Sequence, residues 1–240
     1  MNTLLHLDAS ANRSGESITR ALSARFAAAW LDANPTGTHR YRDLAADPVP
    51  ALTTEFCAIG RRVEQHPPIG RLGVDALLES EDERADWRVT RALVDELVDA
   101  DTVLLGCPMY NFSVPAALKG WIDRITFPGV YRAADGSALL AGTNVVVVAA
   151  SGGGYGPGTP RAAWDFQAPY LRAWLTSIGV PDERIHVIRA ELTLADLAPG
   201  LADLRPLATA SFEAALASLD AVLPACVPAA MSAERTSPKE

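Results

Sequence analysis

The stretch TVLLGCPMYNFSVPAALKGWIDRI, residues 102–125, decides the fold class. Its first five residues are a short apolar run typical of a buried strand, and residues 115–125 have the spacing of a helix. Between them lies a loop that combines aromatic rings with the amide side chain of Asn111. Open α/β sheets bind ligands where a strand ends and the chain turns into the next helix. The loop therefore predicts a site for a flat heteroaromatic ligand whose edge carries hydrogen-bonding groups.

Strand and helix patterns alternate along the rest of the chain. The run of valines in residues 144–150 is apolar on both faces, which predicts a central strand covered on both sides. The other predicted strands are residues 3–8, 39–44, 102–107 and 184–188. The predicted helices are residues 17–30, 87–98, 115–125, 166–178 and 201–223. We therefore predict an α/β, flavodoxin-like fold: a doubly wound five-stranded parallel sheet, order 2-1-3-4-5, with helices on both faces.

The chain has 240 residues, of which 49% are hydrophobic, enough for one domain with a full core. We expect this domain to cover residues 1–223. Residues 53–86 do not fit the alternating pattern and are read as an insertion, either a solvated excursion or a part of the active site. Residues 224–240 are rich in Ala, Pro and Ser, and we expect a disordered tail there.

Charge and cysteine content exclude several classes of protein. A net charge of -8 argues against nucleic-acid partners and anionic membrane surfaces. The three cysteines lack disulfide or metal spacing, and the four histidines form no ligand pair, so we expect free thiols in a reducing compartment and no metal site. We also expect no membrane span and no signal peptide. A cytoplasmic protein is predicted.

Hydroxyl side chains gather after the first predicted strand, in residues 10–19, which we call the serine loop. Ser10, Ser17 and Thr19, together with free backbone N–H groups at a helix start, suit a phosphate group. The loop lacks the GxGxxG pattern of dinucleotide sites, so a monophosphate is favoured. Taken alone, Ser17 is more often a simple helix cap.

Glycines dominate the sequence SGGGYGPG of residues 151–158, the glycine loop, which follows the valine-rich strand. Such a segment exposes its backbone and lets a ligand approach closely. A mobile surface loop is the alternative, although the preceding strand is predicted to be the most buried one. In the predicted topology the serine loop, the glycine loop and residues 108–113, the aromatic loop, meet at the carboxyl edge of the sheet.

Together these loops resemble those of the FMN-dependent NADH:quinone oxidoreductases, also called NADH-azoreductases, of the flavodoxin-like superfamily. The similarity rests on Ser10 with residues 17–19, the PMYNF sequence of residues 108–112 and the SGGG sequence of residues 151–154. It implies bound FMN, with the phosphate at the serine loop and the isoalloxazine along the other two loops. The implied cofactor-binding residues are Ser10, Ser17, Ile18, Thr19, Pro108, Met109, Tyr110, Asn111, Phe112, Ser151, Gly152, Gly153 and Gly154.

The activity implied by the resemblance is two-electron, ping-pong hydride transfer from NADH or NADPH to a quinone, and to azo compounds in two cycles. It needs no catalytic side chain and no metal, because the flavin carries the chemistry. Asn111 and Gly153 are candidate stabilisers of the reduced flavin. The alternatives are a flavodoxin-type electron carrier and a pathway-specific flavin reductase acting on a polycyclic quinone. The preference between NADH and NADPH stays open.

Several positions depart from the family pattern. Gly152 stands where the family commonly has Arg, and Ala133 and Ser177 stand where it often has aromatic rings. By resemblance, Tyr131, Ala133 and Ser177 line the substrate pocket, which we expect to be wider than usual and suited to polycyclic quinones.

Aromatic residues are frequent in and around the two helices that follow the aromatic and glycine loops. We expect Trp121 and Ile125 to be exposed side by side and a homodimer to form with the flavin near its interface. The other aromatic residues behind this expectation are Trp164, Phe166, Tyr170 and Trp174.

Overall fold

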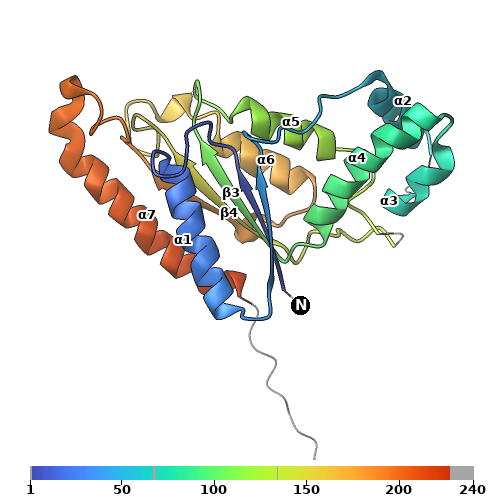
Figure 1. Cartoon of the computed structure of the whole chain (residues 1–240), viewed down its shortest axis with the longest axis horizontal. Helices are drawn as coiled ribbons and strands as arrows, with labels where there is room; N and C mark the ends of the chain where they lie inside the picture. The colour runs from blue at the N-terminus through green and yellow to red at the C-terminus, as the bar shows by residue number, and fades with distance from the viewer. Residues whose placement is uncertain (1, 67–68, 134, 228–240) are drawn as a thin grey trace, which may run out of the picture.

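One all-parallel, five-stranded sheet organises the computed structural model, which describes residues 2–66, 69–133 and 135–227. The strand order is β2-β1-β3-β4-β5, as predicted (Figure 1). The strands are β1 (Thr3–Asp8), β2 (Thr38–Asp43), β3 (Thr102–Pro108), β4 (Asn144–Ala150) and β5 (Ile185–Ala190). All five end at one edge of the sheet, so the loops that follow β1, β3 and β4 share that edge.

Helices cover both faces of the sheet, as predicted. The α-helices are α1 (Ile18–Ala33), α2 (Thr54–Glu64), α3 (Gly70–Gly73), α4 (Glu81–Val98), α5 (Ala116–Ile125), α6 (Ala168–Ser177) and α7 (Arg205–Cys226). Short 3₁₀ turns lie at η1 (Val74–Leu77), η2 (Ala162–Trp164), η3 (Asp182–Arg184) and η4 (Pro199–Leu204). Helices α1 and α7 pack on one face, and α4, α5 and α6 pack on the other (Figure 1).

Strand β4 shows why two helical layers form. Val145 and Val147 belong to the hydrophobic cluster beneath α4, α5 and α6, whereas Val146 and Val148 belong to the cluster beneath α1 and α7. Successive side chains of a strand point to opposite faces, so four consecutive valines require cover on both sides. The predicted central strand is confirmed.

Helix α4 begins at Glu81 rather than at the predicted Trp87. Ser80 is the N-cap, and its hydroxyl accepts a hydrogen bond from the backbone N–H of Glu83. The acidic residues 81–83, read from the sequence as part of the insertion, form the first turn of the helix. Negative charge is favourable there because it faces the positive end of the helix dipole.

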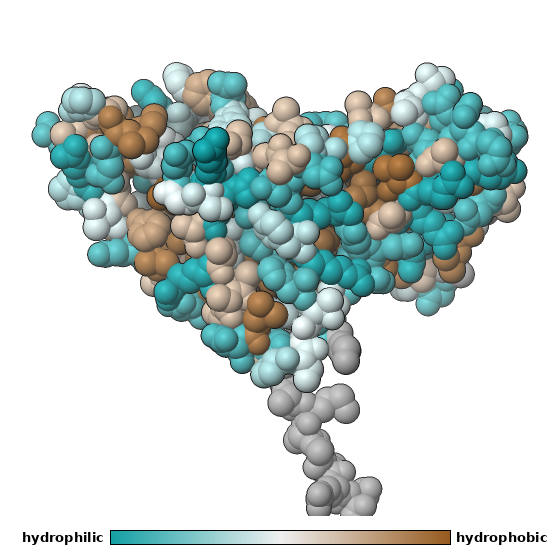
Figure 2. All heavy atoms as spheres, in the orientation of Figure 1, coloured by the Kyte–Doolittle hydropathy of each residue, from teal (hydrophilic) through white to brown (hydrophobic). Residues whose placement is uncertain are grey.

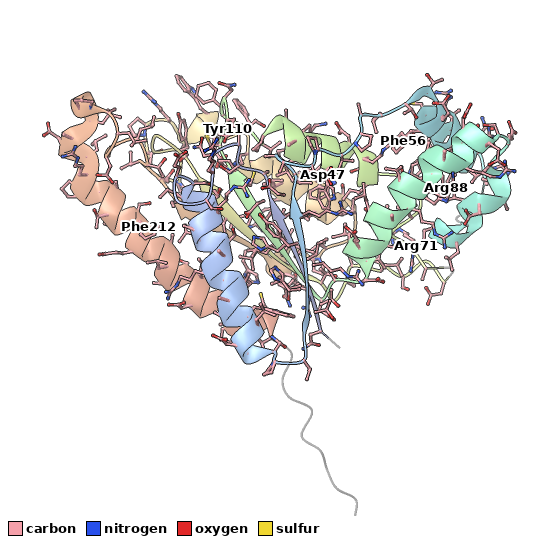
Figure 3. The ribbon with its side chains drawn as sticks, viewed as in Figure 1. Asp47, Phe56, Arg71, Arg88, Tyr110 and Phe212 are labelled. Carbon is pink, nitrogen blue, oxygen red and sulfur yellow. The ribbon has the colours of Figure 1, made fainter. Side chains whose placement is uncertain are left out.

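Residues 53–86 form α2, α3, η1 and the start of α4 rather than a solvated excursion. Figure 3 shows Phe56 on α2, at the end of the molecule that carries α4. Phe56, Ile59 and Val63 join the hydrophobic core cluster of that face. The side chain of Arg62 crosses to α4 and donates 2.9 and 3.0 Å hydrogen bonds to the carboxylate of Glu83, which lower the pKa of Glu83 to about 2. This segment therefore packs on the core of the domain and is hydrogen-bonded to it.

Helix α7 ends at Cys226, three residues beyond the predicted helix end at residue 223, and contains Pro224. The backbone carbonyl of Cys226 accepts hydrogen bonds from the Trp30 indole (3.1 Å) and the Thr102 hydroxyl (3.0 Å). The rest of the predicted tail, residues 228–240, lies outside the described residues.

By length and composition alone, the stretch Pro199–Cys226 is long and apolar enough to cross a membrane, which differs from the expectation of no membrane span. Its inner side chains, including Ala215, Leu219 and Val222, are buried in the core cluster shared with α1.

Candidate functional site

Three hydroxyl groups form a buried cluster where β1 ends and α1 begins. The Ser17 hydroxyl lies 2.8 Å from the Ser10 hydroxyl and 3.1 Å from that of Thr19. All three residues are buried, while Ile18 between them is partly exposed. Ser17 is also the N-cap of α1, so capping and ligand binding are compatible roles for it. The cluster sits at the positive end of the α1 dipole, a position suited to an anion.

Arg20 ties the serine loop to the sheet. Its guanidinium donates to the backbone carbonyls of Ser10 (2.7 Å) and Asn12 (3.0 Å) and to the carboxylate of Asp43 (2.8 Å). It also lies 3.7 Å from the carboxylate of Asp8. The hydrogen bond with Asp43 raises the pKa of Arg20. Two carbonyls of the loop are thus turned inward onto a buried cation.

Asp8 anchors this arrangement from the end of β1. The Ser23 hydroxyl donates to Asp8 (2.9 Å), and so does the Tyr41 hydroxyl (3.1 Å). Burial alone raises the pKa of Asp8, but hydrogen bonding and charge from His6, with Ser23 and Arg20, outweigh it and lower the pKa. Asp8 therefore stays ionised. Gly106 on β3 makes room for it, since a Cβ there would lie 2.0 Å from the carboxylate.

The aromatic loop is a tight turn with strained backbone. The backbones of Tyr110 and Ser113 exchange hydrogen bonds of 3.0 and 3.1 Å, and the two residues between them have positive φ, 48° at Asn111 and 71° at Phe112. Asparagine tolerates this conformation, but a phenylalanine there is a genuine outlier. Such strain clusters at ligand-binding segments, where the surrounding structure enforces it.

Contacts between loops fix the aromatic loop at the edge of the sheet (Figure 3). The Tyr110 hydroxyl accepts a 3.1 Å hydrogen bond from the backbone N–H of Ala11 in the serine loop. The Phe112 ring packs edge-on against Tyr155 of the glycine loop and against Trp164. Met109 and Pro108 are partly exposed at the strand end, and the Met109 N–H donates to the carbonyl of Ala150 (2.7 Å). The structure thus brings the three predicted loops together.

The glycine loop pairs with the segment that follows β5. The backbone N–H groups of Leu192, Thr193 and Leu194 donate to the carbonyls of Gly153, Ser151 and Gly152, at 3.1 to 3.4 Å. A Cβ at Gly152 would lie only 2.6 Å from a methyl carbon of Leu194, so a larger residue there would have to push the Leu194 side chain aside. The Leu194 side chain packs against Gly152. Gly154 is partly exposed beside them.

A cavity of about 1020 Å³ opens between these segments. One part is lined by the predicted residues Met109, Asn111, Phe112 and Gly152–Gly154. The other part is lined by leucines that follow β5 and lead into α7: Leu192, Leu194, Leu201, Leu204 and Leu207. The volume lies at the upper end of the ~300–1,000 Å³ typical of small-ligand sites. The arrangement can hold a flat ring with an apolar extension.

Comparison with known proteins agrees with this geometry. A family model described as "Flavodoxin-like fold" matches residues 2–205. The FMN-dependent NADH:quinone oxidoreductase of Nocardia farcinica is 42% identical over 216 residues, covering 90% of this chain and 95% of that enzyme. The enzyme of the same name from Frankia alni is 39% identical over 205 residues, covering 85% of this chain and 90% of that enzyme.

The chain belongs to this family of FMN-dependent NADH:quinone oxidoreductases. Solved structures agree on the fold. An azoreductase from Bacillus anthracis superposes with a TM-score of 0.74 at 19% identity, covering 93% of this chain and 99% of that one. An FMN-dependent NADH-azoreductase from the same species, in complex with FMN, has a TM-score of 0.72 at 19% identity, covering 95% and 100%.

The predicted substrate-pocket residues of this oxidoreductase family member lie apart from the large cavity. Tyr131 and Ser177 line a different cavity of about 570 Å³, which shares no residue with the first. Tyr131 is buried, and its hydroxyl donates to the carbonyl of Ile125 (2.8 Å). Ala133 is partly exposed and lies outside the residues that line either cavity. Within one chain, the structure does not bring these residues to the three loops.

Burial corrects one argument for a dimer. Trp121 and Ile125 are buried, not exposed, because Trp121 packs edge-on against Trp174 inside the core. Tyr170 is partly buried. Trp164 and Phe166 are exposed, at 51% and 59%, beside the aromatic loop. Two of the six residues thus form the expected exposed aromatic surface.

The site also contains residues that sequence reasoning missed, notably Arg20, Asp8 and Asp43. One signal pointed to Arg20, because a cation in the first turn of a helix opposes the dipole and needs a partner. Among the described residues, no group of three or more His, Cys, Asp or Glu side chains is placed to hold a metal ion.

Proposed function

We propose that this protein binds FMN at the three loops and uses it to transfer two electrons from NADH or NADPH to a quinone. The observation that supports this most is the connection between the serine loop and the aromatic loop. A buried hydroxyl cluster at a helix N-terminus is joined, through Ala11 and Tyr110, to a strained aromatic turn beside a large cavity. Family membership points to the same cofactor.

The residues present fit an FMN molecule. Its single phosphate suits the hydroxyls of Ser10, Ser17 and Thr19, since the α1 dipole supplies partial positive charge without a glycine-rich pyrophosphate motif. The isoalloxazine suits the surface formed by residues 108–112 and 151–154. Within the described residues, the N–H groups of Gly152 and Gly153 donate to no protein atom and are available to a ligand.

When bound, FMN supplies hydride chemistry that takes two electrons from a reduced nicotinamide and delivers them to an acceptor at the same face. Overall, the nicotinamide loses a hydride, and the quinone gains that hydride and one proton from water to become a hydroquinone. The amide of Asn111 and the N–H of Gly153 are placed to donate hydrogen bonds to a negative ring edge. No described side chain is needed as a nucleophile.

We further propose a cytoplasmic homodimer. The exposed rings of Phe112, Trp164 and Phe166 provide an apolar surface next to the site. A second copy would also explain the separate cavity, because Tyr131, Ala133 and Ser177 could then line the acceptor pocket from the other subunit. The free cysteines Cys57, Cys107 and Cys226 support a reducing compartment.

The cofactor is tested first by releasing it from the purified protein with acid and identifying it by chromatography. We expect FMN, and steady-state NADH oxidation that depends on an added quinone. Charge-assisted hydrogen bonds contribute ~1.5–3 kcal/mol each. Replacing both Ser17 and Thr19 by Ala should therefore weaken FMN at least tenfold, whereas Thr36→Ala, at an exposed position beyond the far end of α1, should not.

Recovery of FAD, or of a folded protein that takes up no flavin, would overturn the assignment. Light scattering of the flavin-loaded protein tests the dimer. A monomer that turns over at full rate would show that Tyr131, Ala133 and Ser177 do not serve a second copy.

A further inference from the structure

We propose that the leucines lining the large cavity bind the aliphatic side chain of the acceptor, which makes quinones with an apolar tail the substrates of this protein. We call this part of the cavity the leucine chamber: Leu192, Leu194, Leu201, Leu204 and Leu207. The inference rests on the proposed function and names the acceptor class that the function leaves open.

The chamber is built into the cofactor site rather than placed beside it by chance. Backbone hydrogen bonds join Leu192 and Leu194 directly to Gly153 and Gly152. Leu192 has a positive φ of 63°, a strained conformation for a leucine that the surrounding structure has to enforce. A side chain at Gly152 would displace Leu194. The wall of the chamber therefore starts at the loop proposed to hold the flavin.

Several polar groups that line the cavity already have partners within the protein. The carboxylate of Glu191 accepts hydrogen bonds from the N–H groups of Tyr155 (2.5 Å) and Gly156 (2.6 Å). The Ser211 hydroxyl accepts from the N–H of Glu191 (2.9 Å). The guanidinium of Arg161 lies over the ring of Trp164, 5.8 Å from its centroid. The five leucines make this end of the cavity mainly apolar, which favours a hydrocarbon over a sugar or a phosphate.

The chamber is open at its outer end. Leu194 is 47% and Leu207 59% exposed, and Figure 2 shows apolar residues at the surface near the start of α7. Exposed leucines around a cavity mark a ligand or partner site. A quinone head at Asn111 and Gly153 would direct a substituent along this wall toward solvent. Such a cleft can accept tails of different lengths, because its far end is not closed.

The test compares two quinones with the same head, one bearing a methyl group and the other a chain of five to ten carbons. Each methylene that leaves water raises affinity up to about fourfold. We expect kcat/KM with NADH to favour the tailed quinone at least tenfold. The double variant Leu204→Gln/Leu207→Gln should reduce that preference at least fivefold and weaken binding of the tailed quinone in equilibrium dialysis.

Leu197→Gln is the matched control. Leu197 lies on the same segment and is 77% exposed, but it does not line the cavity. This variant should keep the full preference, its FMN content and its activity with the methyl quinone, and the double variant should keep its FMN content.

Equal kcat/KM for the two quinones, or a preference that survives the double variant, would overturn the proposal. So would a double variant that turns a dimer into a monomer and leaves the preference intact, since the leucines would then be a subunit contact. Absence of FMN or of activity with both quinones would instead refute the proposed function, and dialysis would still report whether the chamber retains the tail.

Discussion

The two ends of the proposed cofactor site differ in how the protein holds them. At the serine loop the important groups are buried, charged and cross-linked: Arg20 joins two backbone carbonyls to the carboxylate of Asp43. At the aromatic loop the side chains of residues 110–112 are exposed, and the backbone is strained at Asn111 and Phe112. Contacts within the protein hold the serine-loop end in place, whereas the other end presents exposed side chains to a ligand or to a second protein.

This difference teaches where specificity can change. A substitution at the serine loop disturbs a network that also supports β1, β2 and α1, so it costs stability. A substitution at the ring end changes surfaces that carry little of the fold. Family members can therefore share the hydroxyl cluster of the serine loop, here called the anion cradle, while differing in the acceptor. Gly152, which stands where the family commonly has Arg, is one such difference near the other end of the site.

The largest effect is expected from Arg20→Ala. It leaves Asp8 and Asp43 without their cation, and removing one partner of a buried ion pair costs about 3–5 kcal/mol. We expect about 3 kcal/mol, the lower end, because Asp43 is partly exposed. The free energy of unfolding from urea titration measures this, and FMN affinity should fall as well.

Arg25→Ala is the matched control, because Arg25 lies on the same helix in an exposed ion pair with Asp220. Its effect should stay below about 1 kcal/mol. Arg20→Lys should recover part of the stability but not the FMN affinity, since an ammonium cannot bridge the carbonyls of Ser10 and Asn12 as the planar guanidinium does. Equal losses in Arg20→Ala and Arg25→Ala would refute the contrast between the two ends.

Strain at Phe112 predicts a smaller and unusual effect. Phe112→Gly should be more stable than Phe112→Ala by about 1 kcal/mol, because only glycine adopts positive φ without cost. Both variants lose the ring and its contacts with Tyr155 and Trp164, so turnover should fall several-fold in both. Thermal unfolding and steady-state kinetics measure the two effects. An alanine variant as stable as the glycine variant would mean that the turn relaxes in solution.

The sequence was sufficient for the sheet order and for the three loops because those signals are local. Four consecutive valines and a proline-aromatic turn need no knowledge of distant residues. The contacts of Arg20 were not predicted because its partners come from three separate segments: β1, the serine loop and β2. The prediction that Trp121 is exposed was wrong for the same reason, since its burial depends on Trp174 from another helix. The leucine chamber depends on pairing between residues 151–153 and 192–194, which no local pattern reveals.

The smallest expected effect concerns pH and His39 on β2, whose ring stacks on that of His6. The His39 side chain is largely exposed, and partial desolvation, with the charge of His6, lowers its pKa. The unfolded chain therefore takes up a proton near pH 6.5 that the folded protein resists, and stability falls as the pH drops through this value. His39→Gln should flatten the change in Tm between pH 7.5 and 5.5, while Leu197→Gln should not. An unchanged slope in His39→Gln would show that His39 does not contribute to the pH dependence of stability.

The guanidinium that joins Ser10, Asn12 and Asp43 has a consequence for how the protein matures. All its bonds are made within the polypeptide, so the anion cradle is complete as soon as the chain has folded. Loading with cofactor is then a docking event onto a finished surface and not the last step of folding.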